Sequence, residues 1–226
     1  MKKIHAFFLF LFFYHVAVAQ NSSMWFSVQA PFRKGNLEWH NDGGYRTYGF
    51  DARASQWLYR TGIRYYASTH FNAAGGYALF SSRAQKDKPD FGVENRLWGE
   101  VVLQHSISEV QVIQRLRIEQ RWFDATSAFA RFQAQRYRYR LGMIKKISSK
   151  SDIQLYNEIM LQTRESALGY NQNRLGMFWH FRPKQNQINL GYTYLHQKNN
   201  PTHLIMLGYQ FINQTTSGNR KVIRHD

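Results

Sequence analysis

An alternation with a period of two runs through most of this chain. The segment 112–122 reads VIQRLRIEQRW, and its apolar residues, including Leu116 and Ile118, share one parity. The other parity holds its charged residues: Arg115, Arg117, Glu119 and Arg121. Because successive side chains of a β-strand point to opposite sides, the segment is predicted to be a strand with one apolar and one charged face. A helix would mix the two sets around its circumference.

Segments with the same alternation recur on both sides of this one. The clearest occupy 153–162 and 173–182, and others occupy 37–42, 57–65, 94–104, 188–194 and 205–211. The clearest segments span about ten residues, the length of a tilted strand that crosses a bilayer. In the long segment 129–147, Arg131 and Gln133 lie on the wrong parity. Either a bulge near Gln135 resets the face or these residues project beyond the membrane.

The alternating segments predict an all-β fold, an up-and-down antiparallel transmembrane β-barrel. Eleven candidate strands can be counted, and the segment from Met24 to Phe32 is the weakest of them. Because bacterial single-chain barrels have an even number of strands, we expect ten or twelve. Short polar turns (SISE, SSKSD, PKQNQ) alternate with longer joins (RAQKDKPDFGV, RESALGYNQ, HQKNNPTH). The short turns are expected at the periplasmic end and the longer joins at the extracellular end.

A soluble β-sandwich or lipocalin-like barrel is the alternative fold, because its strands alternate as well. Its apolar face would fill the core, and its charged face would meet water. Two features favour the membrane-spanning barrel. Aromatic residues form 16% of the chain, and several lie on apolar faces near strand ends: Trp57, Trp122, Tyr137 and Trp179. The charged faces carry both signs, as a packed polar lumen would.

The first twenty residues have the pattern of a secretory signal peptide. Lys2 and Lys3 precede an apolar run over 6–13, and the small-residue triplet 17–19 follows. The run is too short for a spanning helix, so we expect cleavage near Ala19. The predicted organisation is a signal peptide at 1–19, an outer-membrane β-barrel at 20–213 and a polar C-terminal tail at 214–226. The expected location is the cell outer membrane, and the absence of cysteine excludes disulfides.

The formal net charge of +16 suggests attraction to polyanions. The basic residues are interspersed rather than clustered, so nucleic acid is not expected as a partner. We expect contact with outer-membrane lipids including lipopolysaccharide, insertion by the barrel-assembly machinery, and a monomer.

The parity of each strand predicts a charge network on the lumen side. It comprises Glu38, Arg60, Arg64, Glu94, Arg96, Glu100, Arg115, Arg117, Glu119, Arg121, Arg136, Arg138, Arg140, Glu158, Arg174 and Arg182. Pairing between the carboxylates and neighbouring guanidiniums accounts for most of the set. The surplus of arginine leads to a further hypothesis, that the lumen favours anions.

Enzymatic chemistry is not expected, although a lipid-modifying acyl hydrolase or acyltransferase remains an alternative. The candidates are His40 with Asp42, and His105 beside Ser106, and neither forms a nucleophile motif. Adjacent strand residues point to opposite faces, which separates His105 from Ser106. We expect no metal and no cofactor, because no histidines stand at ligand spacing on one face. A structural or adhesive barrel that presents loops such as 84–93 is a third possibility.

The run ENRLWGEVVLQ from Glu94, followed by IQRLRIEQRWF from Ile113, resembles the domain-of-unknown-function 2490 family of uncharacterised Bacteroidota outer-membrane barrels. The segments LYRTGIRYY, AGGYALF, RYRYRLGM, YNEIML and NQNRLGMFW are also similar to this family, and together they cover most of the mature chain. The resemblance implies an outer-membrane barrel with no assigned activity. One departure from outer-membrane barrels in general is the end of the chain, where a polar, basic tail follows the aromatic Phe211.

Overall fold

The computed structural model describes residues 22–83, 90–125, 131–164, 167–198 and 201–212. Twelve strands account for almost all of them: β1 (Ser22–Gln29), β2 (Phe32–Lys34), β3 (Leu37–Tyr48), β4 (Asp51–Tyr66), β5 (Phe71–Arg83), β6 (Phe91–Ile107), β7 (Val110–Phe123), β8 (Phe132–Ser148), β9 (Ser151–Arg164), β10 (Ala167–Phe181), β11 (Asn186–His196) and β12 (Thr202–Phe211). Within these ranges no helix is long and apolar enough to cross a membrane.

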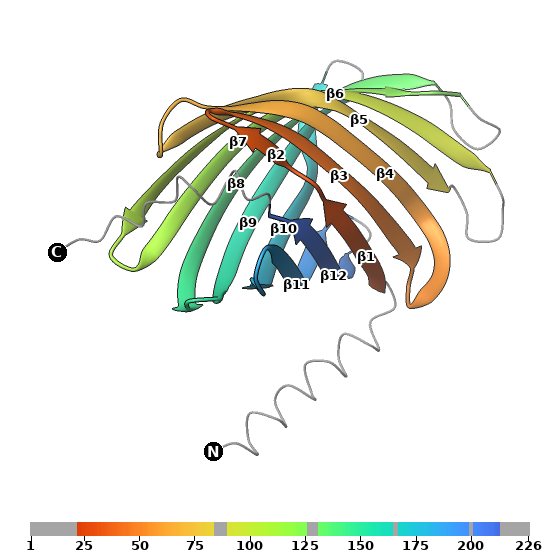
Figure 1. Ribbon diagram of the computed structural model, residues 1–226. Helices are drawn as coiled ribbons and strands as arrows, with labels where there is room; N and C mark the ends of the chain where they lie inside the picture. The colour runs from red at the N-terminus through yellow and green to blue at the C-terminus, as the bar shows by residue number, and fades with distance from the viewer. Residues whose placement is uncertain (1–21, 84–89, 126–130, 165–166, 199–200, 213–226) are drawn as a thin grey trace.

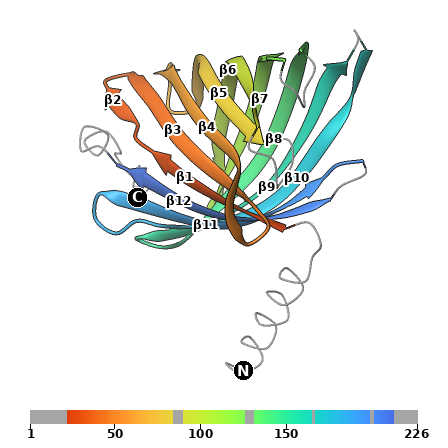
Figure 2. The same cartoon turned by 90° about the vertical axis from the view of Figure 1, so that its right-hand side faces the viewer.

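All twelve strands belong to one sheet that curls round into a closed barrel (Figures 1 and 2). From β3 to β12, each strand pairs antiparallel with the next along the chain. β1 closes the ring by pairing in parallel with β12 and antiparallel with β3. The predicted all-β, up-and-down barrel is confirmed, whereas the segments 1–19 and 214–226 lie outside the described residues.

The ring contains eleven strands, the twelve of the sheet less β2. β2 pairs with the beginning of β3 and β1 pairs with its later part, so both lie along the same edge of β3. Pro31 separates them, since it has no N–H to donate to the ladder. The even number of strands expected for a bacterial barrel therefore does not hold for the closed ring. Even counts follow from antiparallel closure, and here the first and last strands are parallel.

Because β1 and β12 are parallel, the beginning of β1 and the end of β12 lie at opposite ends of the barrel. β1 begins where β12 begins, next to the β5–β6, β7–β8 and β11–β12 connections, which we call the long-loop end. β12 finishes at the other end, next to the turns at 108–109, 149–150 and 182–185, which we call the short-turn end. The β9–β10 connection, expected to be a long join, is only 165–166, because both strands continue beyond the bilayer-length segments.

The two faces of the barrel have the opposite polarity to a soluble protein. Large apolar side chains are exposed on the outside of every part of the wall, including Trp39, Ile63, Leu97, Leu116, Ile118, Leu155, Leu175 and Leu190. The buried residues, which face the lumen, are largely charged or polar, and Glu158 is completely buried. The soluble alternative required an apolar centre, and this arrangement contradicts it.

β8 resolves the ambiguity of the segment 129–147. Its pairing with β7 runs from Phe132 to Lys145 without a register shift, so no bulge lies near Gln135 in that ladder. Gln133 and Gln135 stay on the outer parity towards the long-loop end. A bulge that the sequence did not indicate lies instead in β10, between Tyr170 and Gln172.

Candidate functional site in the barrel lumen

Glu158 on β9 lies at the centre of the lumen charge network. It accepts hydrogen bonds from Arg138 Nη2 at 3.0 Å to each oxygen, from Arg115 at 2.5 Å and from Arg140 at 3.2 Å. Arg174 lies 3.9 Å away. A carboxylate without contact with water is costly unless guanidiniums surround it. The four arginines meet that requirement.

Glu100 on β6 forms a second centre. Its direct cross-strand partner Arg117 donates to it at 2.6 and 2.8 Å. Arg64 on β4 reaches past β5 to the other oxygen at 2.6 Å, and Arg115 lies at 3.8 Å. Because Arg115 contacts both Glu100 and Glu158, the two centres belong to one network.

Glu119 and Glu94 extend the network towards the long-loop end. Arg138 donates to Glu119 at 2.6 Å, and Arg96 lies 3.4 Å from the same carboxylate. Arg96 and Arg121 both pair with Glu94, the latter at 2.5 and 3.0 Å. Arg138 therefore joins the Glu158 and Glu119 centres.

Three of the residues expected in the network lie in separate, smaller groups. Arg60 forms a two-pronged pair with Asp42 at 2.7 and 2.8 Å, and His40 lies 3.2 Å from the same carboxylate. Arg182 pairs with Asp152 at 2.5 Å near the short-turn end. Glu38 accepts a hydrogen bond from the Tyr66 hydroxyl at 2.9 Å.

Asp42 completes the first of these pairs, and its parity, the same as that of Glu38, predicts its place on the inner face. Asp152 completes the second pair and was not among the residues predicted for the lumen. It has the same parity as Glu158 in β9, and this signal could have identified it.

Two arginines of the inner face have no carboxylate of the described residues in ion-pair contact. Arg136, a predicted network residue, donates to the Gln162 side-chain oxygen at 2.9 and 3.3 Å. Arg46 lies over the Trp25 ring, with its Cζ atom 3.8 Å from the ring centroid, and its Nε is buried without a hydrogen-bond partner. Both side chains line a cavity.

This cavity of about 760 Å³, which we call the lumen cavity, lies towards the long-loop end. Its rim includes small hydroxyl side chains: Ser22, Ser23, Thr47, Ser55 and Ser82. Eight arginines of the described residues line it, against three carboxylates: Arg46, Arg60, Arg96, Arg117, Arg121, Arg136, Arg138 and Arg174 against Asp42, Glu94 and Glu119. Part of its wall is apolar, formed by Trp25, Leu58, Ala78, Phe80 and Trp98.

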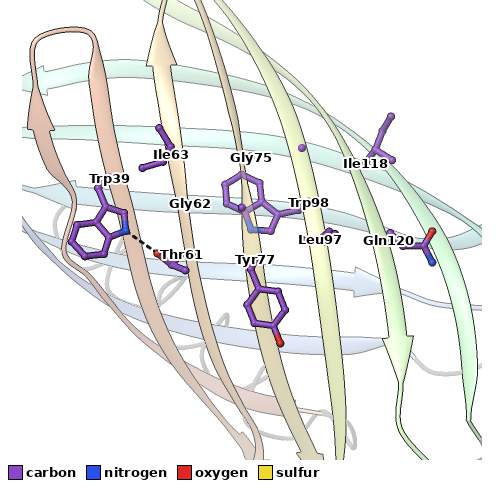
Figure 3. A pocket seen from close by; sticks show the side chains of 12 residues that line it. Trp39, Thr61, Gly62, Ile63, Gly75, Tyr77, Leu97, Trp98, Ile118 and Gln120 are labelled. Carbon is purple, nitrogen blue, oxygen red and sulfur yellow. Dashed lines mark hydrogen bonds between the residues drawn. The ribbon is translucent and has the colours of Figure 1, made fainter.

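Glycines make room for the apolar wall. Gly62 faces the lumen, and a Cβ atom there would lie 2.6 Å from the Trp98 ring and 2.5 Å from the Gly75 carbonyl oxygen. On the outer surface, Gly75 and Gly99 form part of a shallow groove flanked by Trp39, Ile63, Tyr77, Leu97 and Ile118 (Figure 3). The Trp39 indole donates to the Thr61 hydroxyl across this groove at 2.9 Å. The Trp98 ring therefore packs directly against the backbone of the wall at Gly62, where no side chain intervenes.

The residues considered for catalysis are placed as follows. His40 and Asp42 share the inner face, where Arg60 occupies both carboxylate oxygens. His105 and Ser106 are adjacent in β6 and point to opposite faces near the short-turn end. Over the ranges that the structure describes, no group of three acidic or histidine side chains could hold a metal ion.

The fold and site define a closed β-barrel with an apolar outer surface and a charged lumen. The chain belongs to the family described as "Protein of unknown function (DUF2490)", which matches residues 22–220. The family resemblance found in the sequence is thereby confirmed. No curated protein matches the chain. Among solved structures, the β domain of the Bordetella autotransporter Brka is similar, with 10% identity, a TM-score of 0.49, and coverage of 82% of this chain and 87% of that one.

Proposed function

We propose that the chain is an integral outer-membrane β-barrel that binds anions at one end of its lumen and does not act as an open pore or an enzyme. The observation that carries this proposal is the inverted polarity of the wall. Leu116 and Ile118 are 57% and 56% exposed, whereas their neighbours Arg117 and Glu119 are 5% and 2% exposed. An outer face of exposed apolar side chains is unfavourable in water. The same face is favourable when lipid hydrocarbon surrounds the barrel and the polar side chains line its lumen.

Polar side chains on the outer face support a lipid environment, because they are hydrogen-bonded to neighbours within the wall. Asn41 accepts from the hydroxyls of Thr61 at 2.9 Å and Tyr59 at 3.1 Å. Gln114 accepts from the Tyr139 hydroxyl at 3.0 Å. An unsatisfied polar group in hydrocarbon costs several kcal/mol. Such pairing is unnecessary for groups that water can reach.

The network centred on Glu158 supports the proposal of a lumen that blocks bulk diffusion. Glu158, Met160 and Thr193 are among the most deeply buried side chains, and all three face the lumen. The guanidiniums that hold Glu158 come from β7, β8 and β10, so side chains fill the space inside this part of the wall. A solute would have to break several buried ion pairs to pass there.

The lumen cavity supports the anion preference. Its eight arginines and three carboxylates leave a positive surplus among the residues that line it. A positive, partly enclosed site concentrates anions near it.

Outer-membrane lipids, including lipopolysaccharide, are the proposed neighbours of the apolar outer face.

Two measurements on the same preparation test this proposal. Membrane fractionation with heat-modifiability on gels is expected to recover the folded chain in the outer membrane, and planar-bilayer recordings are expected to show little conductance. A folded chain that stays in solution without detergent contradicts the membrane assignment. Large, steady conductance contradicts the closed lumen, and cation selectivity contradicts the anion preference.

A further inference from the structure

We propose that the lumen cavity binds an amphiphilic anion, a phosphate or carboxylate group joined to an apolar body. This inference rests on the anion preference of the proposed function and specifies the chemistry of the ligand. A cavity of about 760 Å³ is in the size range that encloses a small organic molecule. The cavity has a basic wall and an apolar wall, and together they determine the chemical class of the ligand.

The basic wall has donors that the protein does not use. Arg46 Nε is buried without a hydrogen-bond partner, although the guanidinium is held in place by its contact with Trp25. A cation–π contact engages the face of a guanidinium and leaves its N–H groups free at the edge. Arg46 lines the cavity, so its terminal N–H groups, rather than the buried Nε, are the donors that an anion there would use.

Arginines outnumber carboxylates around Arg46. Arg96, Arg138 and Arg174, from three other strands, line the same cavity as Arg46. Arg96 and Arg138 have carboxylate partners. Among the described residues, the carboxylate in contact with Arg174 is that of Glu158 at 3.9 Å, and Arg174 also donates to the Gln172 side-chain oxygen at 2.8 and 3.2 Å. Like charges held together in a partly enclosed site are unfavourable. A bound phosphate or carboxylate between Arg46 and Arg174 would offset this repulsion and accept paired hydrogen bonds.

The apolar wall selects for the apolar body of the ligand. Leu58, Ala78, Phe80 and Trp98 form a buried apolar cluster on the lumen side, and Trp25 packs against it. These residues share the cavity with the arginines, so one ligand can contact both walls. An inorganic anion would leave the apolar wall wet. An organic anion would cover it and gain about 25 cal/mol for each Å² removed from water.

Binding to the protein folded in neutral detergent micelles tests the proposal. The probes are phenyl phosphate, octyl phosphate, inorganic phosphate and phenol, and calorimetry reports their affinities. We expect phenyl phosphate or octyl phosphate to bind at least about tenfold more tightly than inorganic phosphate or phenol, because only these probes use both walls. Preference for phenyl phosphate indicates a soluble aromatic ligand, and preference for octyl phosphate indicates one derived from lipid.

Arg46→Gln and Arg174→Gln are expected to weaken that binding by about tenfold, since each removes a charged hydrogen-bond donor. Arg53→Gln is the matched control, because Arg53 is exposed near the same end, pairs with Asp51 at 2.7 Å and does not line the cavity. Heat-modifiability verifies that each variant is folded. Equal loss in Arg46→Gln and Arg53→Gln would overturn the proposed site.

The probes also separate this inference from the function on which it rests. If inorganic phosphate binds as tightly as both organic phosphates, the anion preference stands and the amphiphilic site fails. If phenol binds as tightly as phenyl phosphate, the basic wall contributes nothing and the site fails as well. If neither inorganic nor organic phosphate binds, both the anion preference and this inference fail.

Discussion

Replacement of Glu158 by Gln tests the central role of this carboxylate in the lumen. The amide keeps the shape of the side chain and removes its charge. Glu158 is completely buried, and Arg138, Arg115 and Arg140 all donate to it within 3.2 Å. In the variant these guanidiniums stay buried and lose their shared counter-charge.

The contacts that remain set the size of the effect. Removal of one partner from a buried ion pair costs about 3–5 kcal/mol. Arg138 retains Glu119 at 2.6 Å, and Arg115 remains 3.8 Å from Glu100, so part of the charge stays compensated. We therefore expect a loss of about 3 kcal/mol in the free energy of unfolding, at the lower end of that range.

Urea unfolding of the barrel in phospholipid vesicles, followed by tryptophan fluorescence, measures this loss. Glu109→Gln is the matched control, because it makes the same chemical change at an exposed position in the β6–β7 turn. The control is expected to change stability by less than about 0.5 kcal/mol. If Glu158→Gln is no less stable than Glu109→Gln, the ion pairs around Glu158 do not stabilise the barrel.

Two other predictions concern the parallel pairing of β1 with β12 and the packing of Gly62 against Trp98. An epitope placed just before β1 and one placed just after β12 are expected on opposite faces of the membrane, and antibody access from one side to both would contradict the parallel closure. Gly62→Ala is expected to destabilise the barrel by about 1–3 kcal/mol, since the new methyl group would collide with Trp98 and the Gly75 carbonyl. Gly99→Ala, where nothing lies within 4 Å of an added Cβ, is the control, and equal urea midpoints for the two variants would refute the packing account.

Side-chain parity predicts the faces of the strands well, because the pleat of a strand is a local property. Arg117 and Glu119 were expected on the inner face from their alternation with Leu116 and Ile118, and the structure places them there. The same alternation gives the antiparallel barrel, since strands of about ten residues with one apolar face leave few other arrangements.

Closure and pairing across the lumen could not be predicted in this way, because they depend on contacts between residues far apart in the chain. The parallel pairing of β1 with β12 makes the ring odd-numbered, and no local pattern distinguishes it from antiparallel closure. The carboxylates were expected to pair with guanidiniums of neighbouring strands, but Arg115, besides its contact with Glu100 on β6, reaches past β8 to Glu158. The unpaired state of Arg46 likewise depends on which strands face β3 across the lumen.

The most direct test of the inverted polarity is the accessibility of spin labels on the barrel in vesicles. The chain contains no cysteine, so single cysteines can carry a nitroxide at outward Leu116 and Ile118 and at Gln56 in the lumen cavity. We expect the labels at 116 and 118 to collide with lipid-soluble oxygen and to be shielded from a water-soluble nickel chelate, and the label at 56 to be reached by the chelate. If the chelate reaches all three labels equally, the apolar face does not lie in lipid and the membrane-barrel account is wrong.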